Sequence, residues 1–226
     1  MREFFNSKPN TPLHGFAQIT LKIYEKSLLF SRISKLKAWK LARREKVLKL
    51  NIGSGAAKIN NWINIDMGLG ADLVLDVRRG LPFKNNSINI IYSEHFVEHL
   101  SLEEGTSFVR ECFRCLKTGG VMRIATPDLD FIVDKYSTNW KNQEWLSWPE
   151  HQTITTKCRM INIAFRSWGH RYLYNEEDLK KQLKKNGFKR IRRCNWNESD
   201  YRELCNLETR SDSKLIIEAL KYDNNY

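Results

Sequence analysis

The sequence lacks long apolar runs, paired cysteine motifs and internal repeats, and each absence argues against a class of protein. No stretch approaches the roughly 18 to 20 apolar residues that span a bilayer, and the N-terminal segment has no apolar core of a secretory signal. The five cysteines form an odd set without paired C-x-x-C units, which argues against a disulfide framework or a four-cysteine zinc site. A composition with 41% hydrophobic residues over 226 positions argues against disorder. We therefore expect a cytoplasmic globular protein with reduced cysteines.

Positive charge is concentrated near the N-terminus. The formal net charge is +12, and residues 1–44 hold 10 basic and 2 acidic side chains. Apolar residues recur there at helical spacing with basic residues between them, which predicts an amphipathic helix within residues 21–44. The expected apolar stripe consists of Leu29, Ile33, Leu36 and Trp39. We interpret residues 1–45 as a basic helical extension that covers one edge of the next domain, with contact of residues 20–44 to an anionic membrane or to phosphate groups as the alternative.

From residue 46 onward, short apolar runs alternate with helical segments. Strands alternating with crossovers predict an α/β fold, namely a Rossmann-like, doubly wound, seven-stranded and mostly parallel sheet. A helix is expected over 102–116, beginning after Ser101 and stopped by Gly119 and Gly120, and another over 176–185 with Asn175 as its N-cap. The expected strands are VLKLNIG (47–53), WINID (62–66), ADLVLDV (71–77), INIIYS (88–93), GGVMRIATPD (119–128), 189–194 and 214–219.

A tryptophan-rich stretch interrupts the second domain, which we assign to residues 46–226. Residues 138–170 show little periodicity and hold four of the seven tryptophans, Trp140, Trp145, Trp148 and Trp168. We interpret this stretch as an insertion beside the sheet. Tryptophan faces suit stacking against a sugar ring or a base, and they also fill cores, so both interpretations remain open.

A glycine turn and two carboxylates follow successive strands. Gly53 and Gly55 end the first strand, Asp66 ends the second and Asp76 the third. The carboxyl ends of parallel strands meet at one edge, where open α/β folds bind ligands. A dinucleotide site needs a third glycine, where this chain has Lys58, and a carboxylate about 20 residues after the turn. The pattern therefore favours an adenosine compound without a pyrophosphate.

These segments resemble the class I S-adenosylmethionine-dependent methyltransferases, closest to the group called methyltransferase type 11. The resemblance is carried by KLNIGSG (49–55), WINID (62–66), LVLDVRRGLPFKNNSINIIYSEHFVEHL (73–100), FVRECFRCLKTGGVMRIATPD (108–128) and GHRYLYNEEDLKKQLKKNGF (169–188). It implies S-adenosylmethionine as the cofactor. The residues that it implies around the cofactor are Asn51, Gly53, Ser54, Gly55, Asp66, Met67, Asp76, Val77, Ser93 and Glu94.

Histidines follow the fourth expected strand. His95 to His99 match H-x-x-E-H, a zinc-peptidase pattern when it lies on a long helix, but here it follows a strand end and soon meets Ser101, so no metal is expected. In a methyltransferase, a histidine near the methyl group suits removal of a proton from an attacking hydroxyl. The candidates are His95, His99 and His170, with Asp128 as an orienting or alternative group. Hydrogen bonding to the backbone or closure of the pocket is the competing interpretation.

Three functions remain open from the sequence. The first is O-methylation of a sugar hydroxyl in glycan or surface polysaccharide biosynthesis, which rests on what the resemblance implies. The second is RNA methylation, which is supported by the net charge and by a cluster of basic residues within 180–193. Nucleic acid is not expected as a partner. The fifth strand ends in ATPD (125–128) and lacks the N/D-P-P-Y/F signature for methylation of base amino groups. The third is a non-catalytic binding module that retains the fold.

Overall fold

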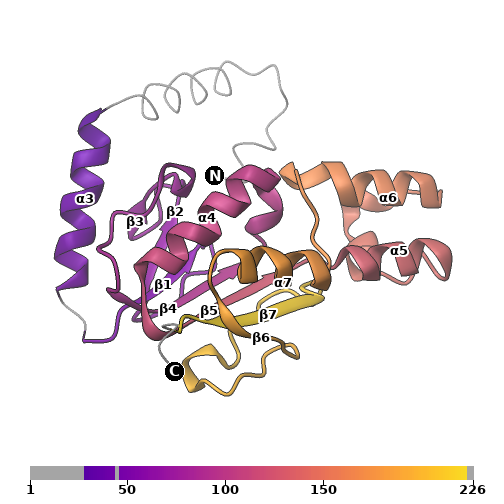
Figure 1. Ribbon diagram of the computed structural model, residues 1–226. Coiled ribbons are helices and arrows are strands. Elements are labelled where there is room, and N and C mark those ends of the chain that lie inside the picture. The colour runs from indigo at the N-terminus through magenta and orange to yellow at the C-terminus, as the bar shows by residue number, and fades with distance from the viewer. Residues whose placement is uncertain (1–27, 44–45, 223–226) are drawn as a thin grey trace, which may run out of the picture.

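The computed structural model describes residues 28–43 and 46–222, and a seven-stranded sheet lies at its centre (Figure 1). The strand order is β3-β2-β1-β4-β5-β7-β6. Strands β1 to β5 pair in parallel, β7 is antiparallel to β5, and β6 is antiparallel to β7, so β6 runs with the first five. The predicted fold class is confirmed. The strands are β1 Lys49–Ile52, β2 Ile63–Asp66, β3 Leu73–Val74, β4 Ile88–Glu94, β5 Leu116–Thr126, β6 Lys189–Arg193 and β7 Leu215–Leu220.

Helices cover one face of this sheet. Figure 1 shows α4 and α7 lying across the strands, with α3 beside the β3 edge and α5 and α6 projecting beyond the sheet. Among the described residues, none of the helices has both the length and the apolarity that a bilayer span requires. The helices are α3 Leu28–Ala42, α4 Leu102–Cys115, α5 Leu129–Ser137, α6 Lys157–Arg166 and α7 Glu176–Lys185.

The opposite face is covered by loops. Trp62 and Leu204 pack there against Tyr92 of β4 and Leu220 of β7. The β1-to-β2 crossover, residues 53–62, contains turns and a bend but no helix.

Buried amides stabilise this non-helical crossover. Asn51 donates to the Ala57 carbonyl (3.0 Å) and to Asn64 Oδ1 (2.9 Å), and Asn64 donates to the Ile59 carbonyl (3.1 Å). Both side chains are 3% exposed. Side-chain amides therefore satisfy backbone groups that a helix would otherwise have satisfied.

The predicted helix starts are confirmed, and one predicted stop is wrong. Ser101 forms a capping box with Glu104, and the Asn175 side chain caps α7. However, α4 ends at Cys115, and Gly119 and Gly120 lie inside β5. The reason is strand pairing, because the Gly119 N–H and the Gly120 carbonyl both bond to the backbone of the residue after β7.

The apolar stripe expected on the N-terminal helix does not face the domain. Among the α3 residues whose side chains are described, 33–42, Ser34 and Ala38 are buried, and the Ser34 hydroxyl donates to the Val74 carbonyl of β3 (3.2 Å). Their small side chains let the helix approach the sheet closely. Ile33, Leu36 and Trp39 are 52%, 62% and 46% exposed. The fourth expected member, Leu29, lies where side chains are not described, and residues 21–27 of the predicted helix lie outside the described chain.

The predicted insertion has a small core of its own. Trp145 packs with Ile132, Met160, Ala164 and Leu173, and all five are at most 8% exposed. This core lies between α5 and α6, which extend from the carboxyl end of β5 (Figure 1). One tryptophan of the insertion therefore fills the core, and the others pack around it.

A fully buried arginine joins the last three strands of the sheet. Arg123 on β5 donates to Glu218 Oε1 of β7 (2.6 Å) and to both oxygens of Glu208 (2.6 and 3.0 Å). Arg192 on β6 reaches the other oxygen of Glu218 (2.6 Å), and Ser199 donates to Glu218 Oε1 (2.6 Å). Burial raises the pKa of Glu218, but these donors outweigh burial, so the pKa lies below its ordinary value. The stability that this carboxylate contributes is therefore present at neutral pH and is lost as pH falls.

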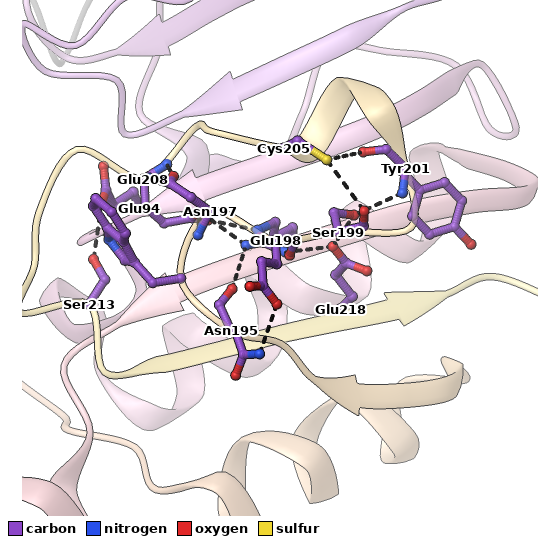
Figure 2. Close-up of polar contacts among 12 residues, drawn as sticks. Glu94, Asn195, Asn197, Glu198, Ser199, Tyr201, Cys205, Glu208, Ser213 and Glu218 are labelled. Atoms are coloured by element: carbon purple, nitrogen blue, oxygen red, sulfur yellow. Dashed lines mark hydrogen bonds and ion pairs between the residues drawn. The ribbon is translucent and has the colours of Figure 1, made fainter.

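The same arginine holds the loop between β6 and β7. It donates to the carbonyls of Glu198 (2.9 Å) and Asn195 (3.3 Å), while Glu208 accepts the Asn197 N–H (2.9 Å). Figure 2 shows these carboxylates and loop residues gathered over the strands. The loop, residues 194–214, is thereby fixed across the sheet.

We expect Arg123→Met to lower the free energy of unfolding by about 3–5 kcal/mol, because two buried carboxylates lose their shared cation. Urea denaturation followed by tryptophan fluorescence measures the change. Arg202→Met replaces an exposed arginine of the same loop and should change the free energy by less than about 0.5 kcal/mol. Equal losses in the two variants would contradict this account.

Candidate functional site

A glycine turn follows β1 at the carboxyl edge of the sheet. Gly53 and Gly55 have φ values of +73° and +51°, and the Gly53 and Ser54 N–H groups donate to the Ile65 carbonyl of β2. A Cβ at Gly53 would lie 2.6 to 2.7 Å from the Phe96 side chain, so only glycine fits there. A Cβ at Gly55 would meet nothing within 4 Å among the described residues. The turn thus packs against Phe96 on one side and borders open space on the other.

Asp66 connects this turn to the loop after β2. Its Oδ2 accepts the Gly55 N–H (2.9 Å) and its Oδ1 accepts the Gly68 N–H (2.7 Å). Met67 follows and is 37% exposed. Each carboxylate oxygen keeps a lone pair for a further donor, such as a ribose hydroxyl.

Asp76 follows β3 and begins a short 3₁₀ helix, Val77–Arg79. It accepts two 2.8 Å hydrogen bonds from the fork of Arg78. Burial raises the pKa of Asp76, but the hydrogen bonds and charge of Arg78 outweigh burial, so the pKa is lowered. The carboxylate is therefore ionised at neutral pH, and Val77 beside it is buried.

Two buried hydroxyls near these strand ends have no partner within the described part of the chain. They are Ser54 Oγ in the glycine turn and Ser93 Oγ at the end of β4. Unpaired buried polar atoms are costly, so they favour a polar ligand at this edge. The glycine turn, Asp66 and these hydroxyls fit an adenosine-containing cofactor. The Asn51 amide is instead engaged with Asn64 and Ala57, and its predicted contact with the cofactor stays a prediction.

Glu94, at the carboxyl end of β4, anchors the loop that precedes β7. It accepts from the Thr209 N–H and hydroxyl (2.9 and 2.7 Å), the Arg210 N–H (3.1 Å) and the Ser213 hydroxyl (3.0 Å). Figure 2 places Glu94 beside Glu208 and Ser213. This carboxylate therefore fixes the wall next to the strand end, and its predicted cofactor contact stays a prediction.

A cavity of about 640 Å³ lies between that loop and the insertion. All four predicted catalytic residues line it, whereas none of the ten predicted cofactor residues does. The two groups meet where Glu94 precedes His95 and where Phe96 packs under Gly53. The lining residues are His95, His99, Pro127, Asp128, Phe131, Ile132, Lys135, Asn142, Gln143, Glu144, Trp145, Trp148, Glu150, Ala164, Trp168, His170, Arg210, Ser211, Asp212 and Lys214.

His95 occupies a strained position in this wall. Its φ is +47°, which is unfavourable for a residue with a Cβ, and its N–H donates to the Ala125 carbonyl of β5 (2.9 Å). The ring lies between two carboxylates, with Nδ1 3.2 Å from Glu98 Oε1 and Nε2 3.6 Å from Asp212 Oδ1. The side chain is 6% exposed. The fold thus holds His95 in an unusual backbone conformation, with its imidazole at the cavity.

Glu98 is the residue that the sequence interpretation missed. It is fully buried, it accepts the Thr126 hydroxyl (3.0 Å), and its Oε1 makes no hydrogen bond with the described residues. The signal was present in the H-x-x-E-H pattern, but Glu98 was considered there only as part of a peptidase motif.

His170 comes from the far end of the insertion and meets His99. Their ring centroids are 5.3 Å apart, and His170 Nδ1 is 2.8 Å from the Ala164 carbonyl. Burial lowers the pKa of His170 by more than this hydrogen bond raises it, so the ring is neutral at pH 7.

Asp128 lines the same cavity, but its oxygens already accept the Asp130 N–H (3.0 Å) and an Arg193 donor (2.8 Å). Both oxygens of Asp128 are therefore engaged, and its predicted role as an orienting or alternative group stays a prediction.

Aromatic rings form the outer wall of the cavity. Trp168 lies 5.3 Å from Trp145, 6.2 Å from Trp148 and 5.2 Å from His151, measured between ring centroids. Trp168 has a φ of +57° and is 40% exposed. The wall therefore offers a broad apolar face beside polar groups.

Comparison with known proteins finds matches over part of the chain. Residues 38–124 match the family described as methyltransferase domain. A probable S-adenosylmethionine-dependent methyltransferase of Mycolicibacterium smegmatis is 36% identical over 58 residues, which cover 24% of this chain and 22% of that protein. The match thus spans about a fifth of the relative's length.

Two solved structures with similar folds can be compared over most of the chain. An S-adenosylmethionine-dependent methyltransferase of Archaeoglobus fulgidus has a TM-score of 0.49 at 13% identity, covering 91% of this chain and all of that one. One from Thermotoga maritima has a TM-score of 0.48 at 16% identity, covering 89% and 95%.

Proposed function

We propose that this chain, whose domain is that of a class I S-adenosylmethionine-dependent methyltransferase, transfers a methyl group to a hydroxyl of a sugar in glycan or surface polysaccharide synthesis. The observation that carries the proposal is that one cavity gathers His95, His99 and His170 beside a tryptophan wall. It lies next to the strand end that adjoins the glycine turn. A site for the acceptor and a site for the cofactor are therefore neighbours.

The residues at the ends of β1 to β4 would hold the cofactor. S-adenosylmethionine, when bound, supplies an electrophilic methyl group on a sulfonium, which is already a good leaving group. Gly53 and Gly55 let the backbone approach the ligand, and Asp66 offers two carboxylate oxygens to its ribose. Asp76 and Val77 would adjoin the adenine, as the family resemblance implies.

We expect calorimetry to detect binding of S-adenosylmethionine and S-adenosylhomocysteine but not of NAD. Asp66→Ala should weaken binding by about 10- to 100-fold, because it removes charge-assisted hydrogen bonds to the ribose. Asp134→Ala replaces an exposed aspartate of α5 and should leave the affinity unchanged. Absence of binding at millimolar ligand would favour the non-catalytic module instead.

The acceptor cavity suits a neutral, polyhydroxylated substrate. Tryptophan faces can stack on a sugar ring, and carboxylates can accept its hydroxyl donors. Four acidic side chains line the cavity against three basic ones, which disfavours a polyanion. The acidic residues are Asp128, Glu144, Glu150 and Asp212, and the basic ones are Lys135, Arg210 and Lys214.

The basic cluster within 180–193, which supported RNA methylation, is partly neutralised by acidic side chains of the same chain. Arg192 pairs with Glu218 and Asp200, and Arg193 pairs with Asp128 and Glu176. Side chains engaged in this way offer less charge to a phosphate backbone. A sugar acceptor is therefore favoured over RNA.

His95 is the residue that we propose takes the proton from the acceptor hydroxyl. Glu98 and Asp212 flank its two nitrogens, so the ring is oriented. The main tasks of the protein are to align the hydroxyl and to accept its proton, because the leaving group needs no further activation.

We expect a screen of nucleotide sugars and oligosaccharides, with radiolabelled methyl donor, to yield a methylated sugar. His95→Gln should lower kcat by about 10²- to 10⁴-fold, as loss of a general base does. Trp168→Ala should raise KM by about 3- to 10-fold through lost stacking. Trp39→Ala, at a tryptophan of similar exposure on α3, should change neither constant. Methylation of RNA but of no sugar would refute the assignment of the acceptor.

The exposed face of α3 supports a contact with an anionic membrane surface. Ile33, Leu36 and Trp39 are about half exposed, and Lys35, Lys37 and Lys40 are exposed beside them. Apolar side chains flanked by lysines suit the boundary between acyl chains and anionic headgroups. A glycan on a lipid carrier would be presented at such a surface. The cytosol stays the predicted compartment, and all five cysteines are unpaired.

We expect the full chain to sediment with phosphatidylglycerol vesicles and not with phosphatidylcholine vesicles. Trp39→Ala should reduce the bound fraction because it removes an anchor, whereas Trp168→Ala, on the cavity wall, should not. If inorganic phosphate releases the chain from the vesicles and Trp39→Ala does not reduce the bound fraction, the segment binds phosphate groups and not the membrane surface. Equal binding to both lipids, or none, would contradict the proposal.

A further inference from the structure

We propose that Glu98, His99 and His170 bind one divalent transition-metal ion at the inner wall of the cavity. One ligand atom from each lies within 4.8 Å of the other two, so small side-chain movements would bring them to metal-binding distance. Glu98 and His99 belong to the 3₁₀ segment after β4, and His170 follows the insertion. The two-histidine, one-carboxylate set is a recurrent ligand set for such ions.

Glu98 supplies the independent sign of a ligand. It is completely buried, and its Oε2 accepts the Thr126 hydroxyl (3.0 Å), whereas Oε1 has no hydrogen bond with the described residues. That oxygen lies 3.2 Å from His95 Nδ1 and 4.0 Å from His99 Nε2. A buried carboxylate oxygen with imidazole nitrogens nearby but no hydrogen bond favours a cation between them, and a metal ion meets that need.

His170 has the outer-shell contact that metal-ligating histidines commonly show. Its Nδ1 lies 2.8 Å from the Ala164 carbonyl. Because a carbonyl oxygen only accepts, Nδ1 carries the proton, and the lone pair is left on Nε2. Thr126 acts in the same way on Glu98, so two of the three ligands are oriented from behind.

The backbone brings the two halves of the cluster together. The N–H groups of Arg171 and Tyr172 both donate to the Glu98 carbonyl, at 2.7 and 3.2 Å. His170 directly precedes them, so its position relative to Glu98 is set by main-chain bonds. Such positioning by rigid elements is what a defined ligand geometry requires.

The ligand set also indicates the kind of metal. Two imidazoles and one carboxylate suit Zn²⁺, Co²⁺ or similar ions better than Mg²⁺ or Ca²⁺, which prefer oxygen ligands. Three protein ligands leave coordination positions open, and His99 and His170 line the cavity. If the proposed function holds, an acceptor hydroxyl would occupy an open position; the metal site itself does not depend on that function.

The test uses the untagged, chelator-treated full chain, titrated with Co²⁺ and separately with Zn²⁺. We expect one metal ion per chain by dialysis and elemental analysis, and visible Co²⁺ absorption of a low-coordinate site. A large excess of Mg²⁺ should not displace Co²⁺. His170→Ala and Glu98→Gln should each weaken metal binding by at least about tenfold. Circular dichroism checks that each variant is folded, and His170→Ala decides the matter if the buried Glu98 variant does not fold.

His151→Ala is the matched control. His151 is also buried, and its Nδ1 also lies on a backbone carbonyl, that of Trp145 (2.9 Å), but it is not part of the cluster. It should bind metal as the unmodified chain does. Substoichiometric binding by the unmodified chain, or binding that survives His170→Ala, would overturn the proposal. Binding of S-adenosylmethionine is measured by calorimetry in the presence of chelator, independently of metal binding. Failure of the metal site and failure of the proposed function can therefore be distinguished.

Discussion

The buried ion cluster around Arg123 is the constraint on which the cavity side of the molecule depends. Its guanidinium crosses from β5 to Glu218 on β7 and to Glu208 in the loop before it, with no exposure to water. A charge in that position persists only if its partners are held in place. The loop between β6 and β7 is therefore fixed, and it can place Asp212 beside His95 and form one wall of the cavity.

The parallel sheet brings two different chemistries to one edge. The ends of β1, β2 and β3 supply a glycine turn and two carboxylates, which suit an adenosine compound. The end of β4 supplies the histidine segment, which faces the cavity instead. The contact between Gly53 and Phe96 joins these halves. The aromatic ring lies so close to the glycine turn that it leaves no room for a Cβ at Gly53. The relative position of the glycine turn and the histidine segment thus depends on van der Waals contact as well as on polar groups.

Local patterns predicted the sheet and the caps at Ser101 and Asn175, because these features are encoded within a few residues. The exposed side of α3 was predicted wrongly, since small residues such as Ala38 allow closer packing than the larger apolar ones nearby. The bonds of Glu94 to residues 209–213 and the burial of Glu98 depend on contacts distant in sequence, which periodicity does not reveal. The roles assigned to His95 and Asp66 remain predictions, although the fold places both at the edge that was expected.

The anchoring of one wall by Glu94 has a consequence for how such a cavity can diversify. Four donors from the C-terminal loop converge on a single carboxylate, so a change in that loop disturbs the strand end as well. The opposite wall belongs to an insertion with its own small core. Substitutions there can reshape the cavity while the sheet keeps its geometry. Adaptation to a new acceptor would therefore be concentrated in residues 138–170, and the remainder of the domain would serve as a constant platform.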